Sequence, residues 1–418
     1  MTTGFHIIRG IIENLFLLFF LYRAVFFVAA LVKKPEKYKA RRAHRYALLI
    51  CAKNEHAVLG KLIHSLQDMD YPKDRYSIFV VADNCSDSTA DVARRAGVIV
   101  YERTDLNRRG KGYALRFLLR RIKADFGFNA YDGYAVFDAD NLVHKKYLSE
   151  INKMFDNGCR IITPYRGSKN FASSWVSGCS SLWFMIKSGL LNCPRTLLSV
   201  GCPVSGTGFV MHRDIVKRIA GWKYFSLAEN MEFSADQLLS GERAVYCPSA
   251  VVYDEQPVRF VDSWTQRMRW VKGYYQVSGK YGLKLLKYMF KGVFTCYDIG
   301  VTLAAGWLFI AGCVLTLVIN SFEYGFGTPE YGVLIGHTII RNIIIFYIIH
   351  LVYAIVTVVT DMKRIYCPPL RKLEYIILYP VFVFTYIPMA FLAPFMPARW
   401  LQVKHNISIS TKELHKVQ

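Results

Sequence analysis

Acidic side chains follow three short apolar runs in the first third of the sequence. These acids are Glu55, Asp83, Asp138 and Asp140. Asp138 and Asp140 stand two residues apart after an extended run, so both carboxylates point to one side and can bind a hard divalent cation. Such a cation would bridge the oxygens of a diphosphate and stabilise it as a leaving group. An Asp-x-Asp triplet alone is weak evidence for a binding site because acids also cap helices. This triplet follows an apolar run, and acids also follow two earlier apolar runs, which together favour a binding site.

The segments around these acids alternate between short apolar runs and stretches of helical spacing. Strands are predicted at residues 46–51, 77–82, 97–101, 134–137 and 160–163, and helices at residues 57–67, 89–96, 111–123 and 145–155. This alternation predicts βαβ units with a mostly parallel sheet. Such sheets bind ligands at the carboxyl ends of their strands, which is where the acids stand.

The composition places the chain partly in a membrane. The 418 residues are 53% hydrophobic and 20% charged, which excludes a disordered or purely soluble protein. The net charge of +22 suits anionic lipid, a phosphate-bearing substrate or nucleic acid. Many of the basic residues stand beside apolar segments, as in cytoplasmic loops next to membrane helices. Nucleic-acid binding would need basic and aromatic residues interleaved on one soluble face, and we predict no nucleic-acid partner.

Three segments are long and apolar enough to cross a bilayer: residues 11–32, 292–320 and 331–360. No small-residue cleavage site follows the first segment, so we expect it to remain in the protein. Basic residues crowd positions 33–45, which predicts an N-terminus outside and a cytoplasmic region up to the second span. The connector 321–330 carries two acids and no Lys or Arg, as expected outside the cell.

The segment 374–396 allows two topologies. Prolines interrupt it, and basic residues follow it. A crossing would place the basic tail outside, whereas a re-entrant or kinked pair would return it to the cytoplasm, and the sequence slightly favours the second. Asp298, Arg341 and His350 fall within the two long C-terminal spans, where ionisable groups face a bundle interior or cavity, or are paired locally. The ten cysteines are scattered singly and are expected to be reduced thiols.

Seven ordered motifs resemble those of a known family. They are residues 51–55 (Cys-Ala-Lys-Asn-Glu), 80–89 (Val-Val-Ala-Asp-Asn-Cys-Ser-Asp-Ser-Thr), 110–115 (Gly-Lys-Gly-Tyr-Ala-Leu), 138–140 (Asp-Ala-Asp), 205–209 (Ser-Gly-Thr-Gly-Phe), 229–233 (Glu-Asn-Met-Glu-Phe) and 266–270 (Gln-Arg-Met-Arg-Trp). The first four resemble the family 2 glycosyltransferases. The last three resemble its membrane-embedded polysaccharide synthases, which include cellulose, chitin, hyaluronan and bacterial exopolysaccharide synthases. The resemblance covers residues 46–270, and Gln-Arg-x-Arg-Trp is its most specific element.

The resemblance implies a fold and a domain organisation. It implies an α/β, GT-A-type (Rossmann-like) cytoplasmic catalytic domain combined with α-helical membrane segments and amphipathic interface helices. On this basis residues 1–40 form the first membrane helix and its basic flank, and residues 41–257 form the catalytic domain. Residues 258–291 form interfacial helices with the Gln-Arg-x-Arg-Trp motif, and residues 292–418 form the C-terminal membrane helices and the tail. The protein would be integral to the plasma membrane.

The resemblance also implies residue roles. The donor, a UDP-sugar, would be bound by Glu55, Asp83, Lys111, Asp138, Gln266 and Arg269. The acceptor would be bound by Ser205, Gly206, Thr207, Gly208 and Trp270. Asp138 and Asp140 would hold Mg²⁺ or Mn²⁺. These roles agree with the residue types, because Lys111 attracts phosphate, Arg269 can contact pyrophosphate in a bidentate way and an indole offers a platform for a sugar ring.

The expected catalytic base is missing. The family places Asp after the Glu of a Thr-Glu-Asp triplet, and this chain reads Ala228, Glu229, Asn230. An amide cannot accept the proton of an attacking hydroxyl. Three explanations remain: an inactivated variant with Asn230 at the base position, which we favour modestly, a base role for Glu229 or Glu232, or a protein that binds without turnover.

Three functions fit the sequence. The leading one is an inverting synthase that extends a β-linked polysaccharide and helps to translocate it. Because three or four spans form only a narrow channel, this function would call for a homo-oligomer or an accessory export protein. The alternative is a transferase that adds one sugar to a lipid or lipid-linked acceptor, which the low span count favours. A third is a catalytically inactive membrane protein that binds a sugar nucleotide, motivated only by Asn230.

Overall fold

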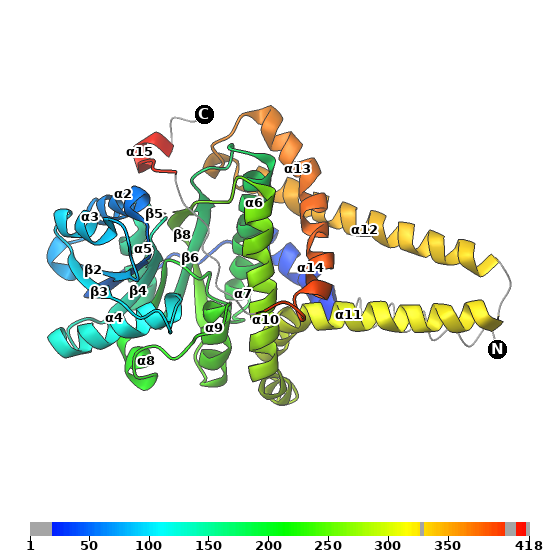
Figure 1. Cartoon of the computed structure of the whole chain (residues 1–418), viewed down its shortest axis with the longest axis horizontal. Helices are drawn as coiled ribbons and strands as arrows, with labels where there is room; N and C mark the ends of the chain where they lie inside the picture. Colours follow the sequence, from blue (N-terminus) through cyan, green and yellow to red (C-terminus); the bar gives the residue numbers. More distant parts are fainter. Residues whose placement is uncertain (1–18, 327–329, 398–406, 415–418) are drawn as a thin grey trace.

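An α/β half and a pair of long apolar helices make up the molecule (Figure 1). The computed structural model describes residues 19–326, 330–397 and 407–414. Helices α6 (Trp175–Ile186) and α10 (Phe260–Met289) stand between the sheet and the long helices. The sheet and the long apolar helices therefore lie on opposite sides of α6 and α10, and the motif of residues 266–270 lies on α10 itself.

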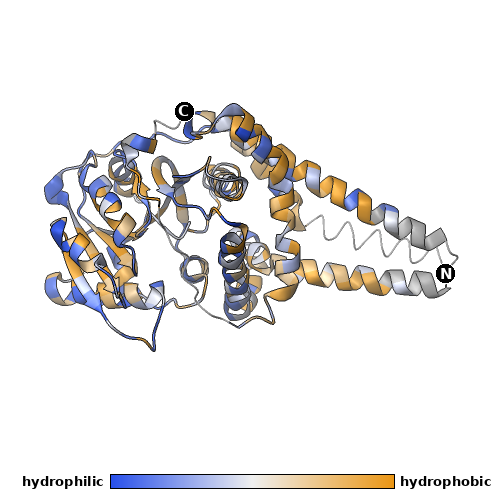
Figure 2. Cartoon of the chain, turned by 45° about the horizontal axis from the view of Figure 1, so that its top comes forward, coloured by the Kyte–Doolittle hydropathy of each residue, from blue (hydrophilic) through white to orange (hydrophobic). Residues whose placement is uncertain are grey.

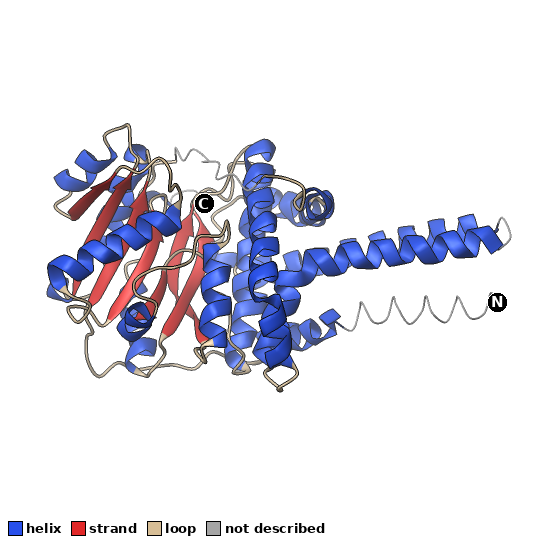
Figure 3. Ribbon diagram, turned by 60° about the horizontal axis from the view of Figure 1, so that its bottom comes forward, coloured by secondary structure: helices blue, strands red, loops and turns tan. Residues whose placement is uncertain are grey.

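An eight-stranded mixed sheet forms the core of the α/β half, in the order β3-β2-β1-β4-β7-β6-β8-β5 (Figure 3). Its strands are β1 (Tyr46–Ala52), β2 (Tyr76–Asp83), β3 (Ile99–Arg103), β4 (Gly133–Asp138), β5 (Leu142–Val143), β6 (Ile161–Ser168), β7 (Phe209–His212) and β8 (Ala244–Asp254). β1 to β4 are parallel, β6 is parallel to β8, and β7 runs antiparallel to both β4 and β6. The five predicted strands are β1, β2, β3, β4 and β6.

Helices bury both faces of the parallel strands. Leu49, Val81 and Val136 pack in the same core cluster as the apolar side of α4 (Lys111–Phe126), while Leu48 and Ile50 pack in the cluster that holds α2 (His56–Gln67) and α5 (Tyr147–Asp156). Because successive strand residues face opposite sides, burial on both sides requires continuous apolar runs. This explains why the strands read as unbroken apolar segments. The helix α3 (Thr89–Arg95) lies beside β2 and β3.

Three helices of the described chain are long and apolar enough to cross a membrane (Figure 2). They are α11 (Phe294–Phe326), α12 (Glu330–Thr360) and the continuous stretch of α13 (Pro369–Phe384) and α14 (Tyr386–Leu392). α11 and α12 cover the second and third predicted spans, and α11 runs on into the predicted connector. Of the first predicted span, residues 19–32 form an apolar helix, and residues 11–18 lie outside the described residues.

The helices α13 and α14 lie across the base of the α11–α12 pair rather than along its length (Figure 1). Residues 407–414 then lie on the α/β half, where the Ile407 amide donates to Glu255 at 3.2 Å and Lys169 donates to the Ile407 carbonyl at 3.1 Å. Leu414, in α15 (Thr411–Leu414), is buried. Residues 407–414 thus lie against the α/β half, while α13 and α14 together remain long and apolar enough to cross a membrane, so both topologies of this segment stay predictions.

A buried ion pair joins α11 to the α/β half. Asp298 of α11 accepts two hydrogen bonds from the guanidinium of Arg195, at 2.6 and 2.9 Å, and a third from the Tyr22 hydroxyl at 2.6 Å. Arg195 lies in the short helix α7 (Cys193–Leu197), and its side chain and that of Asp298 are 2% and 0% exposed. Asp298 thus faces the interior, whereas His350 bonds locally to the Phe346 carbonyl at 2.8 Å.

We expect Asp298→Asn to lower the free energy of unfolding by about 3–5 kcal/mol, because it leaves the Arg195 charge buried without its counter-ion. Chemical denaturation in detergent micelles measures this loss. In the control, Arg195→Met combined with Asp298→Leu removes both charges and recovers most of the stability. A single variant as stable as the wild type would contradict the proposed importance of this pair.

Candidate active site

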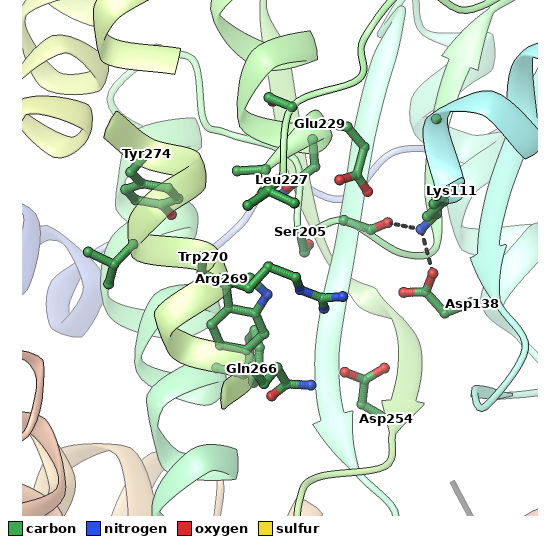
Figure 4. A pocket seen from close by; sticks show the side chains of 18 of the residues that line it. Lys111, Asp138, Ser205, Leu227, Glu229, Asp254, Gln266, Arg269, Trp270 and Tyr274 are labelled. Atoms are coloured by element: carbon green, nitrogen blue, oxygen red, sulfur yellow. Dashed lines mark hydrogen bonds and ion pairs between the residues drawn. The ribbon is translucent and has the colours of Figure 1, made fainter. Parts of the chain in front are cut away.

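A cavity of about 620 Å³ lies between the carboxyl edge of the sheet and the helices α6, α10, α11 and α14. One wall carries the motif residues that follow β1, β2 and β4, and the opposite wall comes from α10 and the apolar helices. Figure 4 shows Glu229, Lys111, Asp138 and Asp254 facing Arg269 and Trp270 across this space. The fold therefore brings together predicted site residues that are as far apart in the sequence as Glu55 and Trp270.

Asp83, at the end of β2, lies deep at one end of the cavity. Its carboxylate forms a buried ion pair with Arg103 of β3 and accepts a hydrogen bond from the Asn84 side chain at 3.0 Å. Burial raises the pKa of Asp83, and Arg103 opposes this shift. Glu55 also lines the cavity, and its backbone amide donates to Thr89 at 2.8 Å. Asp83 and Glu55, two of the predicted donor-binding residues, thus lie at the ends of adjacent strands.

Lys111 connects the sheet to the 205–208 loop. At the start of α4, its ammonium group donates to Asp138 and, at 2.8 Å, to the Gly206 carbonyl (Figure 4). Burial disfavours the charged form of Lys111, but Asp138 and Glu229 outweigh burial and raise its pKa. The lysine is therefore a fixed positive charge beside Asp138, and not an exposed helix-start residue.

Three carboxylates, those of Asp138, Asp140 and Asp254, line the cavity together. Burial and the nearby Asp140 and Asp138 raise the pKa of Asp254, while Arg166 opposes the shift through an ion pair. Asp254 also accepts a hydrogen bond from Asn141 at 2.6 Å. Within the described residues, no group of three or more His, Cys, Asp or Glu side chains is arranged to hold a metal ion by itself.

These oxygens nevertheless fit a hard divalent cation. Asp138 and Asp140 offer carboxylates to the cavity. Burial and then the charges of Asp140 and Asp138 raise the pKa of Asp254, and a bound cation would offset the repulsion among these carboxylates. Mg²⁺ binds through one or two protein carboxylates, with substrate phosphates and water completing its shell. Two aspartates are therefore enough if a diphosphate supplies the other ligands.

The 205–208 loop divides between the cavity and the protein interior. Ser205 and Gly206 line the cavity, whereas Thr207 and Gly208, which we expected at the acceptor, are not among the described lining residues. The Thr207 hydroxyl accepts a hydrogen bond from the Asp138 amide at 3.0 Å and so fixes the end of β4. Gly208 has φ +62°, and a Cβ there would lie 2.6 Å from Val252. Thr207 and Gly208 therefore support the cavity wall through contacts with the protein interior.

Glu229 and Asn230, at the start of α9 (Glu229–Leu239), both line the cavity. Burial raises the pKa of Glu229, and Lys111 opposes this shift. The Asn230 amide nitrogen donates to the Val204 carbonyl at 3.0 Å, a bond that an ionised aspartate could not make. Glu232 points elsewhere, because its carboxylate binds Lys280 and the Phe225 and Ser226 amides. The structure therefore leaves Glu229 as the carboxylate of this motif in the cavity.

The predicted α10 residues Gln266, Arg269 and Trp270 all line the cavity. Their spacing of three and four residues places them on one face of the helix. The Trp270 indole stacks on Trp183 with ring centroids 5.7 Å apart, and Trp183 stacks on Tyr386 at 6.1 Å. Burial lowers the pKa of Arg269, and Glu229 and Asp138 oppose the shift.

Sequence reasoning missed several residues of the site. They are Arg103, Arg166, Trp183, Lys187, Asp254 and Tyr386. Asp254 ends β8, so the rule that found the other strand-end acids could have found it. Trp183, Lys187 and Tyr386 carry no local signal, since they reach the cavity only through the packing of α6, α10 and α14.

Comparison with known proteins identifies the family. Residues 44–273 match the family described as "Glycosyltransferase like family 2", and the chain belongs to it. A probable glycosyltransferase of Bacillus subtilis, YdaM, is 25% identical over 302 residues, which are 66% of this chain and 67% of that protein. The β-monoglucosyldiacylglycerol synthase of a Synechocystis species is 24% identical over 241 residues, which are 55% of this chain but only 47% of the synthase.

A solved structure supports the predicted fold. The mannosyltransferase PcManGT from Pyrobaculum calidifontis, in complex with GDP-Man and Mn²⁺, has a TM-score of 0.58 at 16% identity. The match covers 80% of this chain and 91% of that one. The prediction of a GT-A-type α/β core with apolar helices is thus confirmed. The chain is a glycosyltransferase of this family.

We expect Asp140→Asn to weaken Mn²⁺-dependent binding of UDP or GDP by about tenfold or more, because one carboxylate charge next to the diphosphate is lost. Calorimetric titration with and without Mn²⁺ measures the effect. Asp91→Asn, an exposed change on α3, is the matched control and leaves binding unchanged. Equal Mn²⁺ dependence in Asp140→Asn and the wild type would exclude Asp140 as a metal ligand.

Proposed function

We propose that this protein is a membrane-bound glycosyltransferase that adds one sugar from a nucleotide-diphosphate sugar to a membrane lipid. The observation that carries this proposal is the continuity of the cavity. It runs from Asp83 and Asp138 to apolar residues of the long helices, among them Phe309 of α11, Phe346 of α12 and Ile387 of α14. A charged donor can enter from the side of the sheet, and an acyl or isoprenyl chain can lie among the apolar helices.

The donor end of the cavity has the groups that a nucleoside diphosphate needs. Carboxylates such as Asp83 and Glu55 accept hydrogen bonds from a ribose or base, and Lys111 and Arg269 present positive charge to the diphosphate. Asp138 and Asp140 would hold Mg²⁺ or Mn²⁺, which neutralises negative charge that develops on the leaving diphosphate. A UDP-sugar is the donor that we propose, with inversion at the anomeric carbon.

The acceptor proposal has support from a relative. The Synechocystis relative is named as a synthase of a glucosylated diacylglycerol, which is a lipid product. The chain spans about half the length of the β-monoglucosyldiacylglycerol synthases that it matches, so the acceptor is carried over only as part of this proposal. The apolar wall of the cavity supports it independently.

A polysaccharide synthase is the second candidate. The stack of Trp183, Trp270 and Tyr386 favours it, since aromatic faces can carry the rings of a sugar chain. Three candidate spans in the described chain, one of which lies across the base of the others, are few for a polymer channel. This candidate would therefore need a homo-oligomer or an export partner.

The proposed orientation follows from charge. Basic residues at positions 33–45 argue for a cytoplasmic catalytic domain within residues 41–257 and an N-terminus outside. The tail would be cytoplasmic as well, because residues 407–414 lie on the α/β half. Residues 258–291 would form the interface helix, which agrees with the position of α10 between the two halves.

We expect the purified chain with Mn²⁺, a panel of UDP- and GDP-sugars and total membrane lipid to give a one-sugar lipid product that extracts into organic solvent. Lys111→Met lowers kcat/KM by about 100-fold or more, because a charge at the leaving diphosphate is lost. Lys123→Met, an exposed lysine of the same helix, is the control. A ladder of water-soluble products would favour the polysaccharide synthase, and nucleotide binding without any transfer would favour the inactive protein.

We expect Ser321→Cys to react with a membrane-impermeant maleimide in intact cells, because the end of α11 is placed outside. Ser410→Cys, near the tail, reacts only after the cells are opened. The unmodified chain gives the background from its ten cysteines. Labelling of position 410 in intact cells would overturn the proposed orientation.

A further inference from the structure

The carboxylates that line the cavity all come from one side of it. The carboxylates of the described lining come from the loops and strand ends of the sheet and from the start of α9. The described lining from the N-terminal helix, α6 with the segment after it, and α10 to α14 supplies Arg23, Lys187 and Arg269 and no carboxylate. Arg269 lies near Glu229 and Asp138, so Arg23 and Lys187 are the charged residues of the described lining at the membrane end. This end of the cavity is otherwise apolar, and its charges suit an anionic headgroup.

Lys187 is the clearest part of this pattern. It begins a π-helical segment, residues Lys187–Asn192, and π-helical turns often occur at functional sites. Its ammonium group lies 4.7 Å from the centre of the Trp183 ring, and no described carboxylate lies within ion-pair distance of it. Burial, with the charges of Arg166 and Arg195, lowers the pKa of Lys187 to about 7. An anion would stabilise the charged lysine.

A second polar group, the Tyr386 hydroxyl, belongs to a side chain that packs on the Trp183 indole. The Tyr386 hydroxyl is buried without a hydrogen-bond partner, and the Tyr386 ring stacks on Trp183. A buried hydroxyl without a partner costs free energy, which a ligand oxygen can recover. Two donors of different type, Lys187 and Tyr386, thus flank Trp183 at the membrane end of the cavity.

The chemistry at position 230 points in the same direction. An acceptor hydroxyl must lose its proton as it attacks, and the Asn230 amide cannot accept it. The carboxylate of this motif that lines the cavity is that of Glu229, and burial, which disfavours its charged form, raises its pKa. A phosphate monoester is already ionised near neutral pH, since its second pKa is about 6. It can attack without a base.

We propose that the lipid acceptor ends in a phosphate monoester, which Lys187 and Tyr386 bind, and that a phosphate oxygen is the nucleophile. This proposal rests on the proposed lipid-acceptor function. The oxygen forms a bond to the anomeric carbon, and the bond from that carbon to the donor diphosphate breaks. The electron pair leaves with the nucleoside diphosphate, and no proton moves.

Binding to the full chain in neutral detergent micelles tests the proposal. The probes are two matched pairs, farnesyl phosphate with farnesol and phosphatidic acid with diacylglycerol, followed by tryptophan fluorescence. We expect each phosphate to bind about tenfold more tightly or better than its neutral partner, from a charge-assisted contact. The pair with the larger preference identifies an isoprenoid or a glycerolipid as the source of the phosphate.

Variants separate a site from general attraction between charges. We expect Lys187→Gln to remove the preference for phosphate. Lys187→Arg keeps the preference and shows that the cavity still folds. Lys284→Gln, an exposed change on α10, leaves the preference unchanged. Equal affinity for the members of each pair, or a preference that survives Lys187→Gln, would overturn the inference alone. Failure of all four lipids to bind would overturn the lipid-acceptor function as well.

Asn230→Asp tests the nucleophile. We expect the added carboxylate to repel the phosphate, so that phosphate binding weakens severalfold and transfer does not rise. A rise in transfer with farnesol or diacylglycerol as acceptor would instead identify position 230 as a base site that acts on a hydroxyl, and the phosphate nucleophile would be wrong.

Discussion

The buried contact of Arg195 with Asp298 holds α11, which forms part of the apolar wall of the cavity, against the α/β half. It fixes α11 to α7, and Tyr22 of the N-terminal helix joins it through the same carboxylate. Charges buried this deeply are tolerated only when they are fully hydrogen-bonded, so the relative position of the two halves has little freedom. The cavity walls that come from α10 and α11 therefore stand at a fixed distance from the acids of the sheet.

This fixed geometry would let a water-soluble substrate and a membrane-bound substrate meet in one cavity. In the proposed function, the charged nucleotide sugar comes from water and the lipid acceptor from the bilayer, and both must reach one point. α10 would stand at that boundary, with Gln266, Arg269 and Trp270 on one face. Burial lowers the pKa of Arg269, and the nearby carboxylates of Glu229 and Asp138 oppose this shift, so the arginine interacts with the acidic end of the cavity. The neighbouring Trp270 belongs to the aromatic stack.

The features that could be predicted from the sequence are those that depend on local sequence patterns, namely the strands and the acids at their ends. The strands β1, β2 and β4 lie within two residues of their predicted limits, because burial on both faces demands apolar runs. The acids at their ends lie together because parallel strands end at one edge. Thr207 and Gly208 were expected at the acceptor, but sequence spacing does not tell which side of a loop faces a cavity. Lys187 and Tyr386 could not be predicted, since they meet only after α6 and α14 pack around Trp183.

Asn230 need not mark a damaged site. Its amide donates to the Val204 carbonyl, next to the loop that holds Gly206 and, through it, Lys111. An ionised aspartate in the same rotamer would set oxygen against oxygen at that point, and the loop would have to move. The asparagine therefore stabilises the arrangement around Lys111. A site that keeps its donor groups, holds position 230 neutral and carries positive charge at its membrane end is chemically consistent with an acceptor that arrives already ionised.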